Sequence, residues 1–246
     1  MDTPVDVVNS REAIECITDS IESEAKTAVF TPNVHHVAKV CLDSEFKAVY
    51  AQADLSLVDG MPLVWVSPLF GERLPERING TNLILELCAV LAEKRKSIFL
   101  LAMQEKVADL AYRKLRERYP GLNVSGCGFL GKDDVFDDNK AHKVIENINA
   151  LRPDVLIVGF GAPLQEKWIL QYRHLIDSRV FLAVGSALDF ISARIKRSPK
   201  WMQDAGLEWL HRINQEPARL GKRYIFDGMA FLFFMSCHIL KKSGEK

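Results

Sequence analysis

Short runs of apolar, often β-branched residues alternate along the chain with longer segments whose apolar positions recur at helical spacing. The series begins with a run at residues 4–8 and a helical pattern over residues 10–24. Several runs are apolar at nearly every position, which is typical of strands buried on both faces. The pattern predicts an α/β protein with a Rossmann-like, mainly parallel sheet and helices on both faces. The further strand-like runs are residues 27–30, 55–58, 97–101, 122–125, 155–159 and 180–184.

Polar and turn-forming residues directly follow four of the predicted strands, at residues 31–33, 59–60, 159–166 and 185–189. The carboxyl ends of parallel strands meet at one edge of a sheet, and ligands of open α/β sheets bind beyond that edge. We therefore expect these four loops to share one rim and to form a binding site.

The last fifth of the chain differs from the rest in charge. Residues 192–246 contain 11 Lys and Arg but only 5 Asp and Glu, whereas the whole chain of 246 residues has a net charge of zero. This change predicts an α/β domain over residues 1–193 and a basic helical appendage over residues 194–246, which docks on a membrane or on the active site.

Residues 224–240 have a helical pattern with a Phe/Leu/Met face and basic residues on both flanks. Such a helix is typical of the interface of a membrane that contains anionic lipid. The segment is too short to span a bilayer with ease, and we expect no spanning helix, because the chain has no run of about 18 apolar residues. Two alternatives stay open, since the same face also suits packing on the protein core or on another subunit of a homo-oligomer.

Composition excludes several classes of protein. With 48% hydrophobic and 26% charged residues the chain has an ordinary soluble composition, and its zero net charge gives no reason to expect nucleic acid as a partner. The five cysteines are widely spaced and form no CxxC pair, so we expect reduced thiols and no zinc site. The N-terminal segment lacks a basic start and an apolar stretch of signal-peptide length, which predicts a cytoplasmic protein.

Asp59 and Gly60 come at the end of the predicted strand 55–58, where a carboxylate would project from the edge of the sheet. A partly desolvated carboxylate in that position can act as a general base. The alternative is a simple turn, which is the commonest use of an Asp-Gly pair.

Two further segments are candidates for binding chemistry. Arg77 and Gly80 lie in a loop that runs into a predicted helix, and guanidinium groups and free helix amides both bind phosphate oxygens. Arginines on a solvated surface are the alternative. In the segment 161–166, Gln165 can donate to and accept from a sugar hydroxyl, with a capped turn as the alternative.

Motifs for other chemistries are missing from the sequence. It has no Asp-x-Asp motif for a metal-bound nucleotide, no P-loop and no Gly-x-Ser-x-Gly elbow. It also lacks a GxGxxG fingerprint after the first strand, which argues against an NAD-dependent oxidoreductase. His35 and His36 lack the spacing of two metal ligands on one helical face, and the acidic stretch 133–138 is typical of hydrated surface. We therefore expect neither a metal nor a cofactor.

Five segments, taken together in this order and spacing, resemble the WecG/TagA/CpsF glycosyltransferase family. The segments 197–201 and 215–219 extend the match, which covers nearly the whole chain. The five segments are Thr31-Pro32-Asn33, Asp59-Gly60, Glu76-Arg77-Ile78-Asn79-Gly80, Gly161-Ala162-Pro163-Leu164-Gln165-Glu166 and Gly206-Leu207-Glu208-Trp209-Leu210-His211-Arg212.

This resemblance implies an α/β catalytic domain and an inverting, metal-independent glycosyltransferase. Such an enzyme would move a sugar, N-acetylmannosamine or a related hexose, from a UDP-sugar donor to a polyprenyl-diphosphate-linked saccharide acceptor in cell-surface polysaccharide synthesis. It would work in the cytoplasm, peripherally associated with the inner face of the cell membrane. A catalytically silent, membrane-docked module that binds nucleotide sugars is the alternative.

The resemblance also implies roles for individual residues. Asp59 would deprotonate the acceptor hydroxyl, and Arg77 would neutralise the departing diphosphate. Gln165 would hold a sugar hydroxyl, and Asp189 would recognise the uridine. Further substrate contacts would come from Thr31, Asn33, Gly60, Gly80 and Glu166 on the rim loops and from Arg212, Arg219, Lys222 and Arg223 in the appendage.

The sequence departs from the family pattern at two places. After the strand that ends at Leu101, residues 102–106 replace the glycine-rich turn common in the family. The family's Gly-Tyr-Phe element reads Gly128-Phe129-Leu130, which leaves Phe129 as the candidate to stack on a base. No residue in the sequence decides which sugar is transferred.

Overall fold

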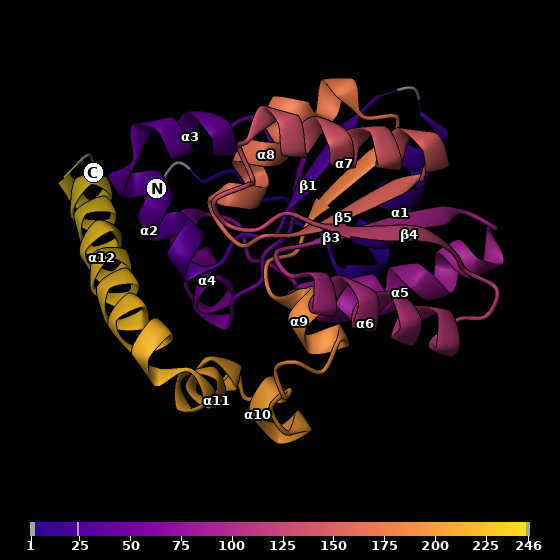
Figure 1. The fold of residues 1–246 in the computed structure, drawn as a ribbon. Coiled ribbons are helices and arrows are strands. Elements are labelled where there is room, and N and C mark those ends of the chain that lie inside the picture. The colour runs from indigo at the N-terminus through magenta and orange to yellow at the C-terminus, as the bar shows by residue number, and fades with distance from the viewer. Residues whose placement is uncertain (1–2, 24, 245–246) are drawn as a thin grey trace.

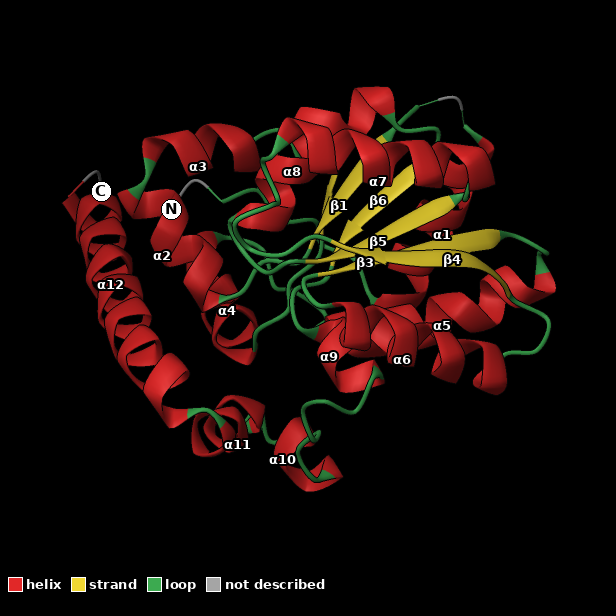
Figure 2. Ribbon diagram, in the orientation of Figure 1, coloured by secondary structure: helices red, strands yellow, loops and turns green. Residues whose placement is uncertain are grey.

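The computed structural model describes residues 3–23 and 25–244 and shows a parallel sheet between two layers of helices (Figures 1 and 2). In this part of the chain six strands pair in the order β2-β1-β6-β5-β3-β4, and every pair is parallel. The predicted fold class is confirmed. The strands are β1 (Thr27–Phe30), β2 (Leu55–Ser56), β3 (Ser97–Ala102), β4 (Asn123–Phe129), β5 (Val155–Gly159) and β6 (Val180–Ala183).

Each face of the sheet has its own hydrophobic core, because successive side chains of a strand point to opposite faces. Leu100 and Ile157 belong to the first core, and Phe99 and Leu156 belong to the second. The helices α1 (Ser10–Glu22), α5 (Gly80–Glu93), α6 (Glu105–Arg118) and α9 (Ala187–Ile191) cover the first core. The second core is covered by α2 (Val34–Leu42), α3 (Ser44–Tyr50), α7 (Asp138–Leu151) and α8 (Leu164–Tyr172), which the short helix η2 (Arg173–Leu175) follows.

Two helices begin at asparagine caps on the carboxyl edge of the sheet. The side chain of Asn33 accepts the amide hydrogen of His35 at the start of α2, and Asn79 accepts those of Thr81 and Asn82 at the start of α5. An asparagine in this position satisfies amides that have no partner inside the helix. The caps therefore fix where the loops after β1 and before α5 lie.

The predicted strand at residues 4–8 is wrong. This segment is extended but pairs with β2 only locally: the amide of Asp6 donates to the Ser56 carbonyl, while the Asp6 carboxylate accepts the Ser56 amide. Pro4 has no amide hydrogen, and a side chain replaces a backbone acceptor, so no regular ladder forms. The strand expected at residues 55–58 is shorter than predicted, since β2 ends at Ser56.

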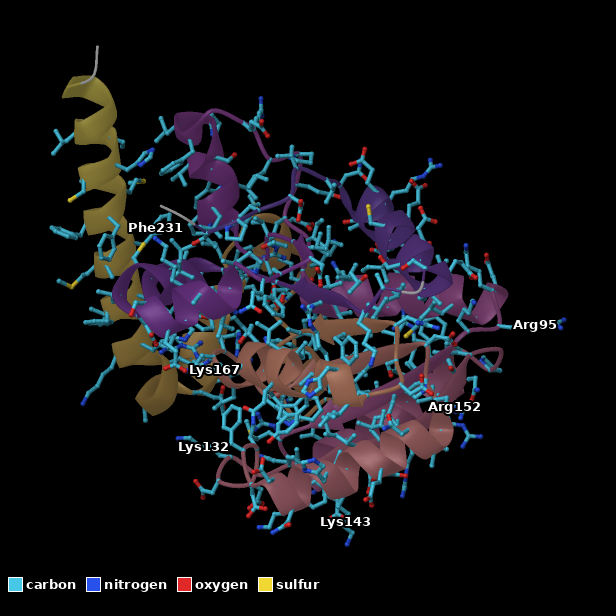
Figure 3. The ribbon with its side chains drawn as sticks, turned by 90° about the horizontal axis from the view of Figure 1, so that it is seen from above. Arg95, Lys132, Lys143, Arg152, Lys167 and Phe231 are labelled. Carbon is cyan, nitrogen blue, oxygen red and sulfur yellow. The ribbon has the colours of Figure 1, made fainter. Side chains whose placement is uncertain are left out.

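After α9 the described chain contains only helices and their connections. These are α10 (Lys200–Asp204), α11 (Glu208–Gln215) and α12 (Pro217–Gly244), and the last runs along the flank of the molecule beside α2 (Figure 1). Phe231 lies on the side of α12 that faces the rest of the molecule (Figure 3). It packs in a third, smaller cluster with Val37 of α2 and Leu63 of α4 (Met61–Val66), the helix that continues into η1 (Ser67–Phe70).

The opposite side of α12 is apolar and exposed. Its large side chains recur at spacings of three and four residues, so they share one face of the helix. By length and composition the segment Leu220–Leu240 is long and apolar enough to cross a membrane, and little of it is buried. Because this criterion concerns length and composition alone, the expectation that no helix spans the membrane stays a prediction. The exposed side chains are Ile225, Phe226, Met229, Leu232, Phe233, Ile239 and Leu240.

Candidate active site

A cavity of about 300 Å³ opens at the carboxyl ends of β1, β2 and β6, between the sheet and the helices α11 and α12. Asp59, three residues after β2, lines it. The Asp59 carboxylate accepts a hydrogen bond from Asn79 Nδ2 at 3.2 Å and one from the amide of Gly80 at 3.3 Å. The cap of α5 thus holds the carboxylate at the edge of the sheet.

Burial raises the pKa of Asp59 above its ordinary value, although the neighbouring Arg77, the Gly80 amide, Asn79 and Arg212 each lower it. Desolvation is the larger effect, because it disfavours the charged form of a carboxyl group. A carboxylate with a raised pKa holds a proton more strongly than an exposed aspartate does. This property suits a group that removes a proton from a hydroxyl.

The guanidinium of Arg77 lies beside Asp59 and is held by the appendage. Arg77 Nη2 is 3.5 Å from Glu208 Oε2 of α11, and Glu208 is only 7% exposed. Arg197 Nε lies 3.8 Å from the other oxygen of Glu208, and Arg197 Nη2 donates to Asn79 Oδ1 at 3.2 Å. These contacts join the appendage to the cap of α5 and so to Asp59.

Two arginines of the appendage also line the cavity. The guanidinium carbon of Arg212 is 5.5 Å from the centre of the Phe190 ring, and Arg212 Nε is buried without a hydrogen-bond partner. Arg223 lies over the ring of Tyr224. Lys222 is exposed and does not line this cavity, and the side chain of Arg219 lies outside the described residues. The structure therefore places Arg77, Arg212 and Arg223 around one space.

The rim residues expected from the sequence divide into two groups. Asn33 and Gly60 line the cavity, and the amide of Gly80 binds Asp59. Thr31 does not line it: this residue is buried, and its hydroxyl donates to the Ala183 carbonyl at 2.8 Å. Thr31 thus fastens the loop after β1 to β6.

Gln165 and Glu166 are buried beneath the rim, and neither lines the cavity. Gln165 Oε1 accepts the amide hydrogens of Gly161 at 3.0 Å and Gly185 at 2.8 Å, while Gln165 Nε2 donates to Glu166 Oε1 at 2.7 Å. His36 Nε2 lies 3.2 Å from the same glutamate oxygen. The polar groups of the glutamine are therefore used in holding the loops after β5 and β6 together.

A second cavity, of about 310 Å³, lies at the ends of β3, β5 and β6 and shares Ser186 with the first. Asp189 lines it, and the Asp189 carboxylate accepts from Arg194 Nε at 2.6 Å. Phe129, the residue expected to stack on a base, is 43% exposed and does not line either of these two cavities.

Several cavity residues carry no role in the sequence analysis. They include Glu208 and also His35 and Asp227, which join α2 to α12 through a contact of 2.8 Å between His35 Nδ1 and Asp227 Oδ2. Arg197, which does not line the cavity, contacts Glu208. The segments around Glu208 and Arg197 belong to the family resemblance, which is a signal for them. His35 and Asp227 are 192 positions apart, and no local pattern connects them.

The described residues contain no group of three or more His, Cys, Asp and Glu that would hold a metal ion. Metal independence stays a prediction, to be tested with a chelator.

Comparison with known proteins adds to this geometry. Residues 1–245 match the Glycosyl transferase WecG/TagA/CpsF family. The chain is 31% identical over 199 residues to the N-acetylglucosaminyldiphosphoundecaprenol N-acetyl-beta-D-mannosaminyltransferase of Bacillus subtilis, with 81% of this chain and 75% of the relative covered. It is 29% identical to the protein of the same name in Bacillus spizizenii, with 82% and 76% covered, and 28% identical to that of Staphylococcus aureus, with 79% and 74% covered. The chain thus belongs to the WecG/TagA/CpsF family of glycosyltransferases.

Proposed function

We propose that this enzyme transfers N-acetylmannosamine from a UDP-sugar to N-acetylglucosamine linked through diphosphate to a polyprenyl lipid. The names of the relatives supply the sugar and the acceptor. The observation that carries the proposal is the first cavity, where Asp59 lies beside Arg77 and faces cations from the appendage. A base and several anion-binding groups around one space suit the attack of an alcohol and the departure of a diphosphate.

The two adjoining cavities fit the two parts of the donor. The uridine lies in the second cavity near Asp189, and the diphosphate crosses at Ser186 into the first. There Arg77, Arg212 and Arg223 take up the negative charge that UDP gains as it leaves. Arginine suits this task because its planar group binds phosphate oxygens in pairs.

Transfer is a single displacement with inversion at the anomeric carbon. The acceptor hydroxyl gives its proton to Asp59 as its oxygen bonds to that carbon, and the bond to the oxygen of UDP breaks on the opposite side. Charge on the leaving group is stabilised by preorganised donors. Asn33 and Gly60 contact the transferred sugar, whereas Thr31, Gln165 and Glu166 support the loops from below.

A screen of UDP-sugars against a short-chain lipid-diphosphate acceptor tests this proposal. UDP-N-acetylmannosamine is expected to give the highest turnover, and turnover should survive EDTA. Failure of every UDP-sugar to be transferred, with UDP still bound in calorimetry, would favour a silent binding module. Turnover that stops with EDTA and returns with Mg²⁺ would contradict metal independence.

We also propose that the enzyme works at the cytoplasmic face of the membrane and is held there by the exposed face of α12. The support is this apolar face together with an acceptor that resides in lipid. Co-sedimentation with vesicles that contain anionic lipid checks this. Replacing Phe226 and Phe233 with serine should reduce the bound fraction, and unchanged binding would contradict the assignment.

A further inference from the structure

The first cavity is lined partly by polar groups and partly by apolar side chains. Asp59 and Asn79 line it with polar groups, whereas Met61 of α4, Trp209 of α11 and Tyr224 of α12 line it with apolar surface. The rings of Trp209 and Tyr224 lie 6.1 Å apart. A ligand that contacts Asp59 and these three residues meets both polar groups and apolar surface in one cavity.

Trp65 extends this apolar surface to the outside. A methyl group on Gly206, which lines the cavity, would lie 2.7 Å from Met61 Cγ and 3.4 Å from Trp65 Cζ2. The indole of Trp65 therefore packs against the edge of the cavity, although the residue is 59% exposed. Trp209, three positions beyond the same glycine, is 41% exposed.

The half-exposed indoles of Trp65 and Trp209 thus lie on either side of the turn at Gly206. Neither residue belongs to a hydrophobic core cluster of the described chain. Single apolar residues at a surface are ordinary, but a group of large ones around the mouth of a polar cavity marks a binding surface. Position matters here more than exposure. Trp65 does not line the cavity itself, but it packs against Gly206, which does. Trp201 of α10 is more exposed, at 64%, yet it neither lines the cavity nor is among the nearest neighbours of Gly206.

The inference rests on the proposed function, in which the acceptor is an amphiphile. Only one sugar and a diphosphate separate the hydroxyl at Asp59 from the first isoprene unit. The hydrocarbon chain must therefore emerge within the reach of the rim. We propose that Trp65 and Trp209 form a subsite for the first isoprene units of the acceptor and guide the lipid out of the cavity.

A comparison of two acceptors tests the subsite in the full-length enzyme without vesicles or detergent. Both are N-acetylglucosaminyl diphosphates; one carries a farnesyl group and the other a methyl group. The measured quantity is the ratio of kcat/KM for the farnesyl acceptor to kcat/KM for the methyl acceptor. Contact of an isoprene unit with an indole face removes about 50 Å² of apolar surface from water, which corresponds to roughly a tenfold change.

Trp65→Ala is expected to lower this ratio about tenfold, mainly through KM for the farnesyl acceptor, and Trp65→Phe should recover most of it. Trp209→Ala should act in the same direction. Trp201→Ala is the matched control and should stay within about twofold of wild type. Because the methyl acceptor reports on the fold and the active site, a misfolded variant loses both rates and leaves the ratio unaffected.

A wild-type ratio in a folded Trp65→Ala enzyme overturns the subsite. A variant that keeps this ratio but binds less to vesicles also overturns it, since Trp65 would then contact the bilayer rather than the acceptor. If the wild-type enzyme uses neither acceptor with any UDP-sugar, the proposed function itself fails. Equal use of both acceptors by wild type contradicts the subsite alone.

Discussion

At the scale of single residues, two opposing effects set the pKa of Asp59. Burial raises the pKa of its carboxyl group, while Arg77 and the hydrogen bonds from Gly80 and Asn79 keep the charged form accessible. The carboxylate is the form that accepts a proton. Activity should therefore rise with pH through a pKa above the ordinary aspartate value and fall as the pH drops below it.

Replacing this carboxylate is the most direct test at the same scale. Asp59→Asn should lower kcat by about 10²–10⁴, the range that general-base catalysis contributes. The folded-state pKa of Asp59 is raised, so its ionised form costs stability at neutral pH. This cost shrinks as the pH falls below the folded pKa and is gone below the ordinary aspartate pKa of the unfolded chain. The melting temperature of the variant at pH 7 should therefore not fall below that of wild type. Full turnover by Asp59→Asn would contradict the assignment of the base.

Arg212 permits a matched comparison of two cations in the appendage. Arg212→Ala removes a guanidinium that lines the cavity and should lower kcat by about 10²–10³, as the loss of one preorganised donor typically does. Lys200 is exposed on α10 and pairs with Asp204, so Lys200→Ala should stay near wild type. The measurement is kcat of each variant from steady-state rates at saturating donor. Similar losses in both variants would mean that net charge, rather than position, is what matters.

At the scale of elements, the turn between α10 and α11 fixes how the appendage sits on the body. Gly206 has a φ of +72° and approaches Met61 so closely that a side chain would overlap it. The backbone conformation and the space both require glycine here. Polar contacts also hold the appendage on the body: Glu208 of α11 pairs with Arg77, and Asp227 of α12 contacts His35 of α2. The appendage is therefore held by both apolar and polar contacts.

Gly206→Ala should therefore displace α11 from α4. We expect a stability loss of about 1–2 kcal/mol from the left-handed backbone, plus a lower kcat because Glu208 and Arg212 move away from Arg77. Gly221→Ala is the control, since a methyl group on that residue of α12 meets nothing within 4 Å. Thermal melting and kcat measure the two effects. An unaffected Gly206→Ala enzyme would show that the turn tolerates a side chain.

At the scale of the whole molecule, the two large cores are independent of the appendage. Among the described residues, the cores on either face of the sheet draw nothing from α10, α11 or α12, and Phe231 and Met235 of α12 enter only the third cluster beside α2 and α4. The sheet and its helices therefore contain their own hydrophobic stabilisation. The appendage instead closes the first cavity, to which Trp209, Arg212 and Arg223 contribute.

A chain truncated after Ala193 should consequently stay folded but lose transfer. The circular dichroism spectrum should keep the signature of an α/β protein, and melting should stay cooperative, with a somewhat lower midpoint because the third cluster is exposed. Turnover should fall below detection, since Glu208, Arg212 and Arg223 are gone. Undiminished turnover would show that the appendage serves only as an anchor, and loss of the folded spectrum would contradict the independence of the two cores.

The sequence by itself determined the α/β class, the parallel sheet and the strand-tip loops. These follow from local periodicity and from polar residues that interrupt apolar runs, both of which are visible within a few residues. Its failure at residues 4–8 has a local cause as well, because the side chain of Asp6 takes a place that a backbone carbonyl would hold in a strand. The family resemblance implied that Asp59 and the cations of the basic tail act on the same substrates, but it did not predict the contacts that bring them together.

Only the tertiary structure decided which of these residues meet. Arg197 and Asn79 are 118 positions apart, and their contact depends on how the appendage folds back over the sheet. The amide of Gln165 looked free to bind a sugar, yet the amides of Gly161 and Gly185 occupy its oxygen. The sequence also left open whether the apolar face of α12 is buried, because a periodic apolar pattern is the same for a face that packs on protein and for one that is exposed. Such facts arise from long-range packing, which a local pattern does not contain.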